Sequence, residues 1–287
     1  MGLTALEQAR LRRGMELVPG LPEVSEKEAG EAVRRIFEDV KASLRVPFVN
    51  FVFRTLANEP AELARVWNAA GPLARTRAFE QAADVLRAGT LMEPLPRPLA
   101  SSDLPEADLP RIRAFVDSIH YALPKLLLVT SLLEAAPPAT STQIPEPLPY
   151  GVAEGTAMVA MVDQETASPA LQALFAAIKE RHGHPGVATF YRSLANWPAV
   201  LDALWERLAP QLDAPAHGER RSALIAEGMR LAASLPGERP GPLPERLRDV
   251  LSVFRLRFIP DLMIDVATVK ALLDGPEAVR RSRFSAA

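Results

Sequence analysis

The sequence contains no cysteine among its 287 residues. This absence excludes disulfides, thiolate metal sites, iron–sulfur clusters and a cysteine nucleophile. The 33 Lys and Arg residues are balanced by 35 Asp and Glu residues, so no basic excess favours nucleic acid. No apolar run is long enough to span a bilayer, and the N-terminus lacks an apolar signal region. The composition therefore predicts a soluble cytoplasmic protein that binds neither nucleic acid nor membranes.

The 27 prolines collect between segments that have the apolar periodicity of helices. Ser25 and Glu28 form a capping-box pattern, which predicts that a helix begins at Ser25. An apolar segment from 112 to 133 predicts a long helix interrupted at Pro124. The only candidate strand is the short segment 158–162. The pattern predicts an all-α fold.

An internal repeat becomes visible when the sequence is compared with itself at an offset of 138. Over residues 37–72, thirteen of 36 residues are then identical. Two helical units of about 130 residues are too few for a solenoid, so we expect an intramolecular pseudo-dimer with a pocket at its seam. The expected parts are an N-terminal segment (1–24), a first helical repeat (25–135), a Pro-rich linker (136–160), a second helical repeat (161–275) and a C-terminal tail (276–287).

Few residues suggest chemistry by themselves. The repeated Arg54 and Arg192 are interpreted as structural residues that bind backbone carbonyls. His182 and His184 are two residues apart, which is not a helical ligand spacing, and no cysteine is available, so no metal or cofactor is predicted. His120 lies in a polar cluster within an apolar helix, and it is either a satisfied core histidine or part of a cavity.

Five segments in register carry a resemblance to a known family. They are 44–51 (LRVPFVNF), 76–80 (TRAFE), 121–125 (YALPK), 148–151 (LPYG) and 257–261 (RFIPD) with 275–277 (GPE). The sequence resembles the group I 2-haloacid dehalogenases from about residue 24 to residue 277. The resemblance implies an all-α fold of two related repeats with the active site between them. It also implies hydrolysis of a carbon–halogen bond beside a carboxylate, in either enantiomer, by a water that an aspartate activates.

The family's site residues match this sequence only in part. The resemblance places the pocket aromatics at Phe48 and Phe51, the paired Thr and Glu at Thr76 and Glu80, the hydroxyl beside the base at Thr189, the base itself at Phe190, the water-holding asparagine at His120 and a pocket tyrosine at Arg255. A phenylalanine cannot accept a proton, so the family's base is missing if this match holds.

Three interpretations follow from that substitution. In the first, the protein is a diverged enzyme in which His120 acts as the base and Arg255 binds the carboxylate of a small organic acid, halogenated or not. In the second, it is a small-acid-binding or scaffold protein that has lost the chemistry. In the third, these polar residues are structural and the pocket has collapsed. The sequence also leaves open a homodimer.

Overall fold

Every regular element of the protein is a helix within the described residues 2–100, 104–137 and 146–286 of the computed structural model. One isolated antiparallel bridge joins Thr76 and Pro147. The segment 158–162 forms no strand. The all-α fold predicted from the sequence is therefore confirmed.

The helices fall into two successive sets. The first set is α2 (Glu31–Leu44), α3 (Phe51–Leu56), α4 (Pro60–Ala74), α5 (Arg77–Ala88) and α6 (Leu109–Leu132). The second set is α7 (Pro169–His182), α8 (Thr189–Leu194), α9 (Pro198–Leu212), α10 (Pro215–Ser234), α11 (Glu245–Val253), a π-helical segment (Phe254–Phe258) and α12 (Ile259–Asp274). Helix α1 (Ala5–Leu17) with a 3₁₀ turn (Val18–Gly20) precedes them, and a second 3₁₀ turn (Pro276–Val279) follows.

Local structure recurs at the offset of 138 residues. Helices α3 and α8, and likewise α4 and α9, begin and end at positions 138 apart. The Val24 N–H donates to the Arg54 carbonyl at 3.2 Å, and the Val162 N–H donates to the Arg192 carbonyl at 2.9 Å. The side-chain amides of Asn58 and Asn196 also bind carbonyls at matching positions. Equivalent residues of the two sets therefore make equivalent local contacts.

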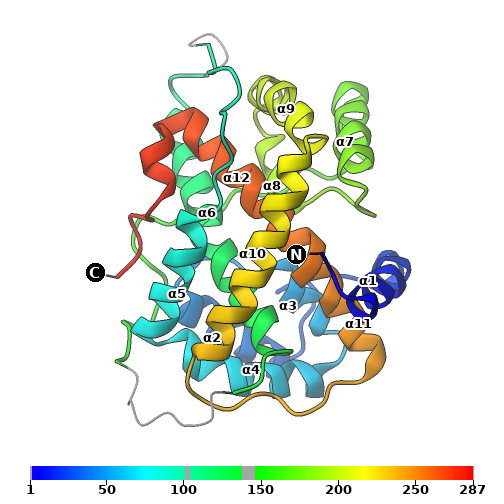
Figure 1. Cartoon of the computed structure of the whole chain (residues 1–287). Helices are drawn as coiled ribbons and strands as arrows, with labels where there is room; N and C mark the ends of the chain where they lie inside the picture. Colours follow the sequence, from blue (N-terminus) through cyan, green and yellow to red (C-terminus); the bar gives the residue numbers. More distant parts are fainter. Residues whose placement is uncertain (1, 101–103, 138–145, 287) are drawn as a thin grey trace.

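The first helices of the two sets lie at different ends of the molecule, whereas α11 of the second set lies beside α1 in the lower part of Figure 1. In Figure 1, α2 to α5 lie at the lower end, α7 to α9 lie at the upper end, and α10 runs between them. The buried helix α6 packs against α5, α10 and α12. Side chains from both sets form one large hydrophobic core.

Helix α6 continues through Pro124, so the predicted interruption was wrong. A proline leaves the carbonyl four residues earlier without its helical hydrogen bond. That carbonyl belongs to His120, and the Arg87 guanidinium of α5 donates to it at 3.4 Å and to the Tyr121 carbonyl at 3.2 Å. A buried arginine therefore supplies the donors that keep the helix continuous.

In the N-terminal region, the helix predicted to begin at Ser25 begins later, and α1 packs on the second set of helices. Ser25 and Glu28 do bind each other's backbone N–H groups, but they close a separate turn, and α2 begins later, at Glu31. Helix α1 lies beside α11, as Figure 1 shows. A Cβ at Gly14 would lie 2.2 Å from the Asp249 carbonyl oxygen, and Arg13 binds the Asp249 carboxylate at 2.7 Å. This close approach fixes α1 to the second set of helices.

Candidate functional site

A cavity of about 280 Å³ lies between the first and second sets of helices. Its walls come from the first turns of α3 and α8, the 3₁₀ turn after α1, the segment 184–188 before α8, and the π-helical segment. This size is at the small end of ligand pockets and suits a small organic molecule. We refer to it as the α3–α8 cavity.

One wall of the α3–α8 cavity is aromatic. The rings of Phe51 and Phe254 meet edge to face with centroids 5.2 Å apart, and those of Phe254 and Phe258 do so at 5.5 Å. Phe254 and Phe258 are the first and last residues of the π-helical segment. Such irregular turns occur often at functional sites because they redirect side chains. The wall offers an apolar surface to a ligand.

Two arginines at positions 138 apart, Arg54 and Arg192, line the cavity, and they differ in whether a carboxylate neutralises them. Arg54 forms an ion pair with Glu23 at 2.8 Å and donates to the Val49 carbonyl at 2.7 Å. The Nε of Arg192 donates to the Val162 carbonyl at 3.2 Å, but its terminal nitrogens make no ion pair or hydrogen bond within the described ranges. Asp163 interacts with Arg192 only at longer range, because its carboxylate accepts from backbone N–H groups. Arg192 is thus the cavity arginine that can bind an anionic ligand.

His182 lines the cavity but has both ring nitrogens occupied. Its Nδ1 lies 2.8 Å from the Ile178 carbonyl oxygen, so this nitrogen is a donor. Its Nε2 lies 2.8 Å from the Asp265 carboxylate, which also accepts from the Tyr191 hydroxyl at 2.8 Å. Burial disfavours the charged ring, but Asp265 outweighs burial and raises the pKa of His182. His182 therefore has both ring nitrogens engaged, and its charged form is favoured by Asp265.

His184 lines the same cavity, but only one of its two ring nitrogens is hydrogen-bonded to a described residue. Its Nε2 lies 3.0 Å from the Asp261 carboxylate, and its Nδ1 makes no hydrogen bond with any residue that the structure describes. Its ring lies against Phe258, with centroids 4.7 Å apart. Burial lowers the pKa of His184, and the bond with Asp261 offsets this only in part. The ring is therefore neutral near pH 7.

Asp261 is held ionised behind His184. Arg221 and Arg257 bind its carboxylate at 3.0 and 2.9 Å, and the side chain is 1% exposed. Burial opposes the charge, but His184 and the two guanidinium groups outweigh it and hold the pKa well below its usual range. An ionised carboxylate accepts, so the Nε2 of His184 carries the ring proton and Nδ1 has the free lone pair.

Asn50, Thr189 and Gln164 add uncharged polar groups to the lining of the α3–α8 cavity. The Asn50 Oδ1 is buried and has no hydrogen-bond partner among the residues that the structure describes. The Thr189 hydroxyl forms no side-chain hydrogen bond within the described part of the chain. Unpaired polar atoms beside a cavity are positions at which a ligand or a water binds.

A second cavity, of about 220 Å³, is also lined by His182. Arg221, Arg257 and His217 contribute to its wall together with Asp261. We call it the His217 cavity. The part of its wall that the structure describes contains no phenylalanine, tyrosine or tryptophan, so it lacks the apolar aromatic surface of the α3–α8 cavity.

Of the residues expected from the sequence, Phe51 and Thr189 line the α3–α8 cavity. Phe48 does not line it and is partly buried against the core. Phe190 is 1% exposed and stacks on Phe115 with centroids 5.9 Å apart, so it faces the core rather than the cavity. Arg255 also lies outside the cavity and pairs with Glu7 of α1 at 3.0 Å.

His120 is buried outside the α3–α8 cavity, where it was expected to border the site. Burial, Arg87 and Lys270 all disfavour its charged form and hold its pKa well below the usual value. The reason for the difference is directional: helix α6 turns His120 toward α5 and α12, while Leu123 and Leu126 of the same helix face the cavity.

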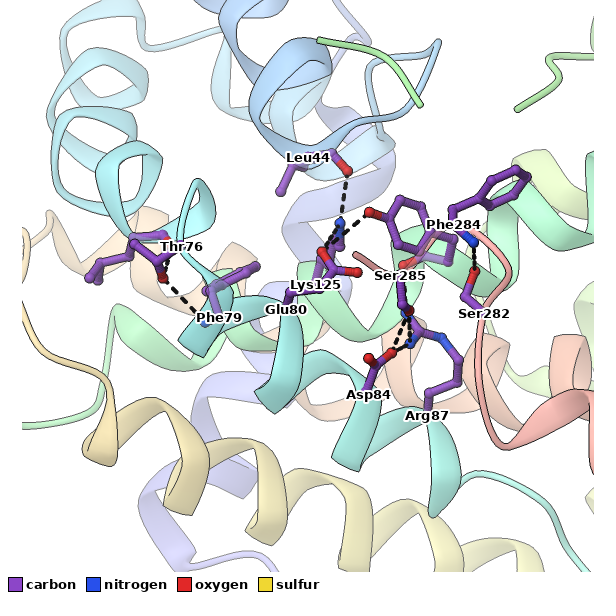
Figure 2. Close-up of polar contacts among 12 residues, drawn as sticks. Leu44, Thr76, Phe79, Glu80, Asp84, Arg87, Lys125, Ser282, Phe284 and Ser285 are labelled. Carbon is purple, nitrogen blue, oxygen red and sulfur yellow. Dashed lines mark hydrogen bonds and ion pairs between the residues drawn. The ribbon is translucent and has the colours of Figure 1, made fainter. Parts of the chain in front are cut away.

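Thr76 and Glu80 belong to a buried polar cluster away from the cavity. Thr76 caps α5, since its hydroxyl accepts from the Phe79 N–H at 3.2 Å. Glu80 pairs with Lys125 at 2.7 Å, and Lys125 donates to the Leu44 carbonyl at 3.1 Å, as Figure 2 shows. Burial lowers the pKa of Lys125 to about 7 even though Glu80 opposes this change.

The roles of four residues in or beside the cavity were not predicted from the sequence. Asn50 was not singled out, Arg192 was interpreted as structural, and His184 was considered only as a metal ligand. Asp261 carried a signal that can be read in hindsight, because it is a carboxylate in a strongly apolar helix. Its partner His184 is 77 residues away in the sequence, so spacing could not reveal the pair.

No group of three or more His, Asp or Glu side chains among the described residues is arranged to hold a metal ion. None of the helices formed by those residues is long and apolar enough to cross a membrane.

Comparisons with known proteins agree on one class. The family model described as halocarboxylic acid dehydrogenase DehI matches residues 47–184. A configuration-inverting 2-haloacid dehalogenase of Alcaligenes xylosoxydans xylosoxydans is 29% identical, over 92% of this chain and 97% of that protein. An (R)-2-haloacid dehalogenase of Pseudomonas putida is 25% identical, over 74% and 76% of the two chains.

A solved structure of a D-2-haloacid dehalogenase in complex with L-LA has the same fold. Its TM-score is 0.78 at 24% identity, over 88% of this chain and 96% of that one. A mutant of a D-2-haloacid dehalogenase with D-2-CPA gives a TM-score of 0.77. The chain is thus similar in sequence to proteins named as 2-haloacid dehalogenases, and it shares the helical fold of these solved structures.

Proposed function

We propose that this protein hydrolyses the carbon–halogen bond of small 2-halo carboxylic acids in the α3–α8 cavity. The observation that carries the proposal is the pairing, in one small cavity, of an aromatic wall with Arg192, whose terminal nitrogens are unoccupied. The guanidinium suits the carboxylate, and the Phe51, Phe254 and Phe258 wall suits the halogen and the short alkyl chain. The family similarity supplies the reaction class.

We also propose that the two sets of helices are an internal repeat packed as a pseudo-dimer, with the substrate at its seam. Helix bounds and backbone contacts that recur 138 residues apart support this arrangement. The asymmetry of the seam then has a function. Glu23 neutralises Arg54 in the first unit, while the equivalent position in the second unit is Met161, which leaves Arg192 to bind the substrate.

Halide release tests the proposed function. The purified protein is incubated with (R)- and (S)-2-chloropropionate separately, and chloride and the configuration of the 2-hydroxy acid are measured. We expect release from both enantiomers, as the sequence resemblance implies, with inversion because water attacks carbon directly. The proposal is contradicted if neither enantiomer of 2-chloropropionate releases chloride and 2-bromopropionate releases no bromide.

The alternative is a small-acid-binding protein without turnover. Phe190 favours it, because the sequence resemblance matches this residue to the family's aspartate and a phenylalanine cannot accept a proton. Binding of lactate or 2-chloropropionate without any halide release over days selects this alternative.

A further inference from the structure

We propose that His184, oriented by Asp261, is the general base that deprotonates the attacking water in the α3–α8 cavity. This inference rests on the proposed function and names a group that can accept the proton of the water, which Phe190 cannot do. It depends on the geometry of the His184–Asp261 pair and on what else faces the cavity.

The choice of His184 follows from comparing the titratable groups that line the α3–α8 cavity. Glu23 is engaged by Arg54, and both ring nitrogens of His182 act as donors, so neither can accept a proton readily. Tyr191 is buried and donates to Asp265, which raises its pKa well above the usual value. His184 alone, among the described groups of this lining, combines a neutral ring with an unoccupied nitrogen lone pair.

Asp261 gives His184 the properties of a base in two ways. It fixes the tautomer by accepting from Nε2, which leaves the Nδ1 lone pair free. It also stabilises the imidazolium that forms when Nδ1 takes a proton, as the carboxylate of a catalytic triad does. Arg221 and Arg257 keep Asp261 ionised and fixed, so Asp261 is a positioning residue.

The cavity also offers partners for the water itself. An ordered water needs two to four polar partners. In the proposed complex the water donates one hydrogen bond to the Nδ1 of His184 and the other to the unpartnered Oδ1 of Asn50. The Thr189 hydroxyl, which sits at the start of α8, is a third polar group of the same lining.

The step balances without any co-reactant. The water oxygen forms a bond to the 2-carbon, and the halide leaves with the electron pair of the carbon–halogen bond. One water proton passes to the Nδ1 of His184, and the imidazolium later releases it to solvent. The products are the 2-hydroxy acid, halide and one proton.

The pH dependence of kcat follows from the surroundings of His184. The charged and titratable groups near it are Asp261, Arg257 and His182, and Arg192, Arg54 and Glu23 share its cavity. Burial holds the pKa of His184 below 6.5. Activity should therefore be flat around neutral pH and fall on an acidic limb below about 6.5.

The decisive variant is His184→Gln, with His217→Gln as the matched control, since His217 lines only the His217 cavity. Loss of a general base lowers kcat by about 10²–10⁴-fold. We expect a loss of that size in His184→Gln, with lactate binding changed less than about threefold, and kcat of His217→Gln within about twofold of the unaltered protein.

Nitrogen NMR of histidine-labelled protein gives a readout that does not need turnover. We expect one ring with an unprotonated Nδ1 and a protonated Nε2 at pH 7, whose signals disappear in His184→Gln. If His184→Gln retains normal kcat while the unaltered protein releases halide, the base assignment is wrong and the proposed function stands. If the unaltered protein releases no halide, both are overturned. An Nδ1-protonated His184 also overturns the base assignment.

Discussion

Replacing Arg192 by glutamine removes the proposed carboxylate ligand without changing the shape of the α3–α8 cavity greatly. A hydrogen bond to a charged group contributes about 1.5–3 kcal/mol. Arg192 is only half-buried, so solvent screening favours the lower end of that range. About 1.4 kcal/mol corresponds to a tenfold change in affinity. We therefore expect the KM for 2-chloropropionate to rise about tenfold, with kcat nearly unchanged.

The equivalent pair in the first set of helices provides the matched control. Arg54→Gln alone would leave Glu23 as an unpaired negative charge in the cavity, so the control is the double variant Glu23→Gln/Arg54→Gln. It keeps the net charge of the cavity, and its KM should stay within about threefold of the unaltered value. Chloride release is followed over a range of substrate concentrations. Equal KM changes in the two variants, or no change in Arg192→Gln, would refute the reasoning.

Further predictions concern the residues that lie outside the cavity. Phe190→Asp removes a buried aromatic ring and buries a carboxylate, so it should lower the free energy of unfolding by at least about 3–5 kcal/mol and restore no activity; a soluble, more active variant contradicts this placement. Lys125→Met leaves Glu80 buried and unpaired and should cost about 3–5 kcal/mol in urea unfolding, whereas Lys125→Met/Glu80→Gln should recover most of that loss. The unfolded chain holds the Lys125 proton up to a pKa of 10.5 and the folded one only to about 7, so stability should rise with pH between these values, and this rise should be absent in Lys125→Met.

The sequence predicted the helices for physical reasons that act locally. Apolar periodicity and first-turn prolines specify helices within a few residues of their ends, and the offset of 138 brings α3 and α8 into correspondence. The interruption predicted at Pro124 was wrong because Arg87, which lies in another helix, binds the carbonyl that the proline leaves without its helical hydrogen bond. The helix start predicted at Ser25 was wrong because the same reciprocal hydrogen bonds between Ser25 and Glu28 here close a single turn.

The side chains of the site were harder to predict. A matched position fixes where a residue lies along a helix but not which of its neighbours it faces, and this is why Phe190, His120 and Arg255 lie outside the cavity. The His184–Asp261 pair joins residues far apart in the sequence and depends on Arg221 and Arg257 for its charge state. No local pattern contains that information.

The most direct measurement of where a 2-halo acid binds is the anomalous X-ray signal of bromine. Crystals of His184→Gln soaked with 2-bromopropionate retain the substrate if this variant is inactive. The account predicts a bromine peak against Phe51, Phe254 and Phe258, with the carboxylate on Arg192. A bromine peak found only outside the α3–α8 cavity would contradict it.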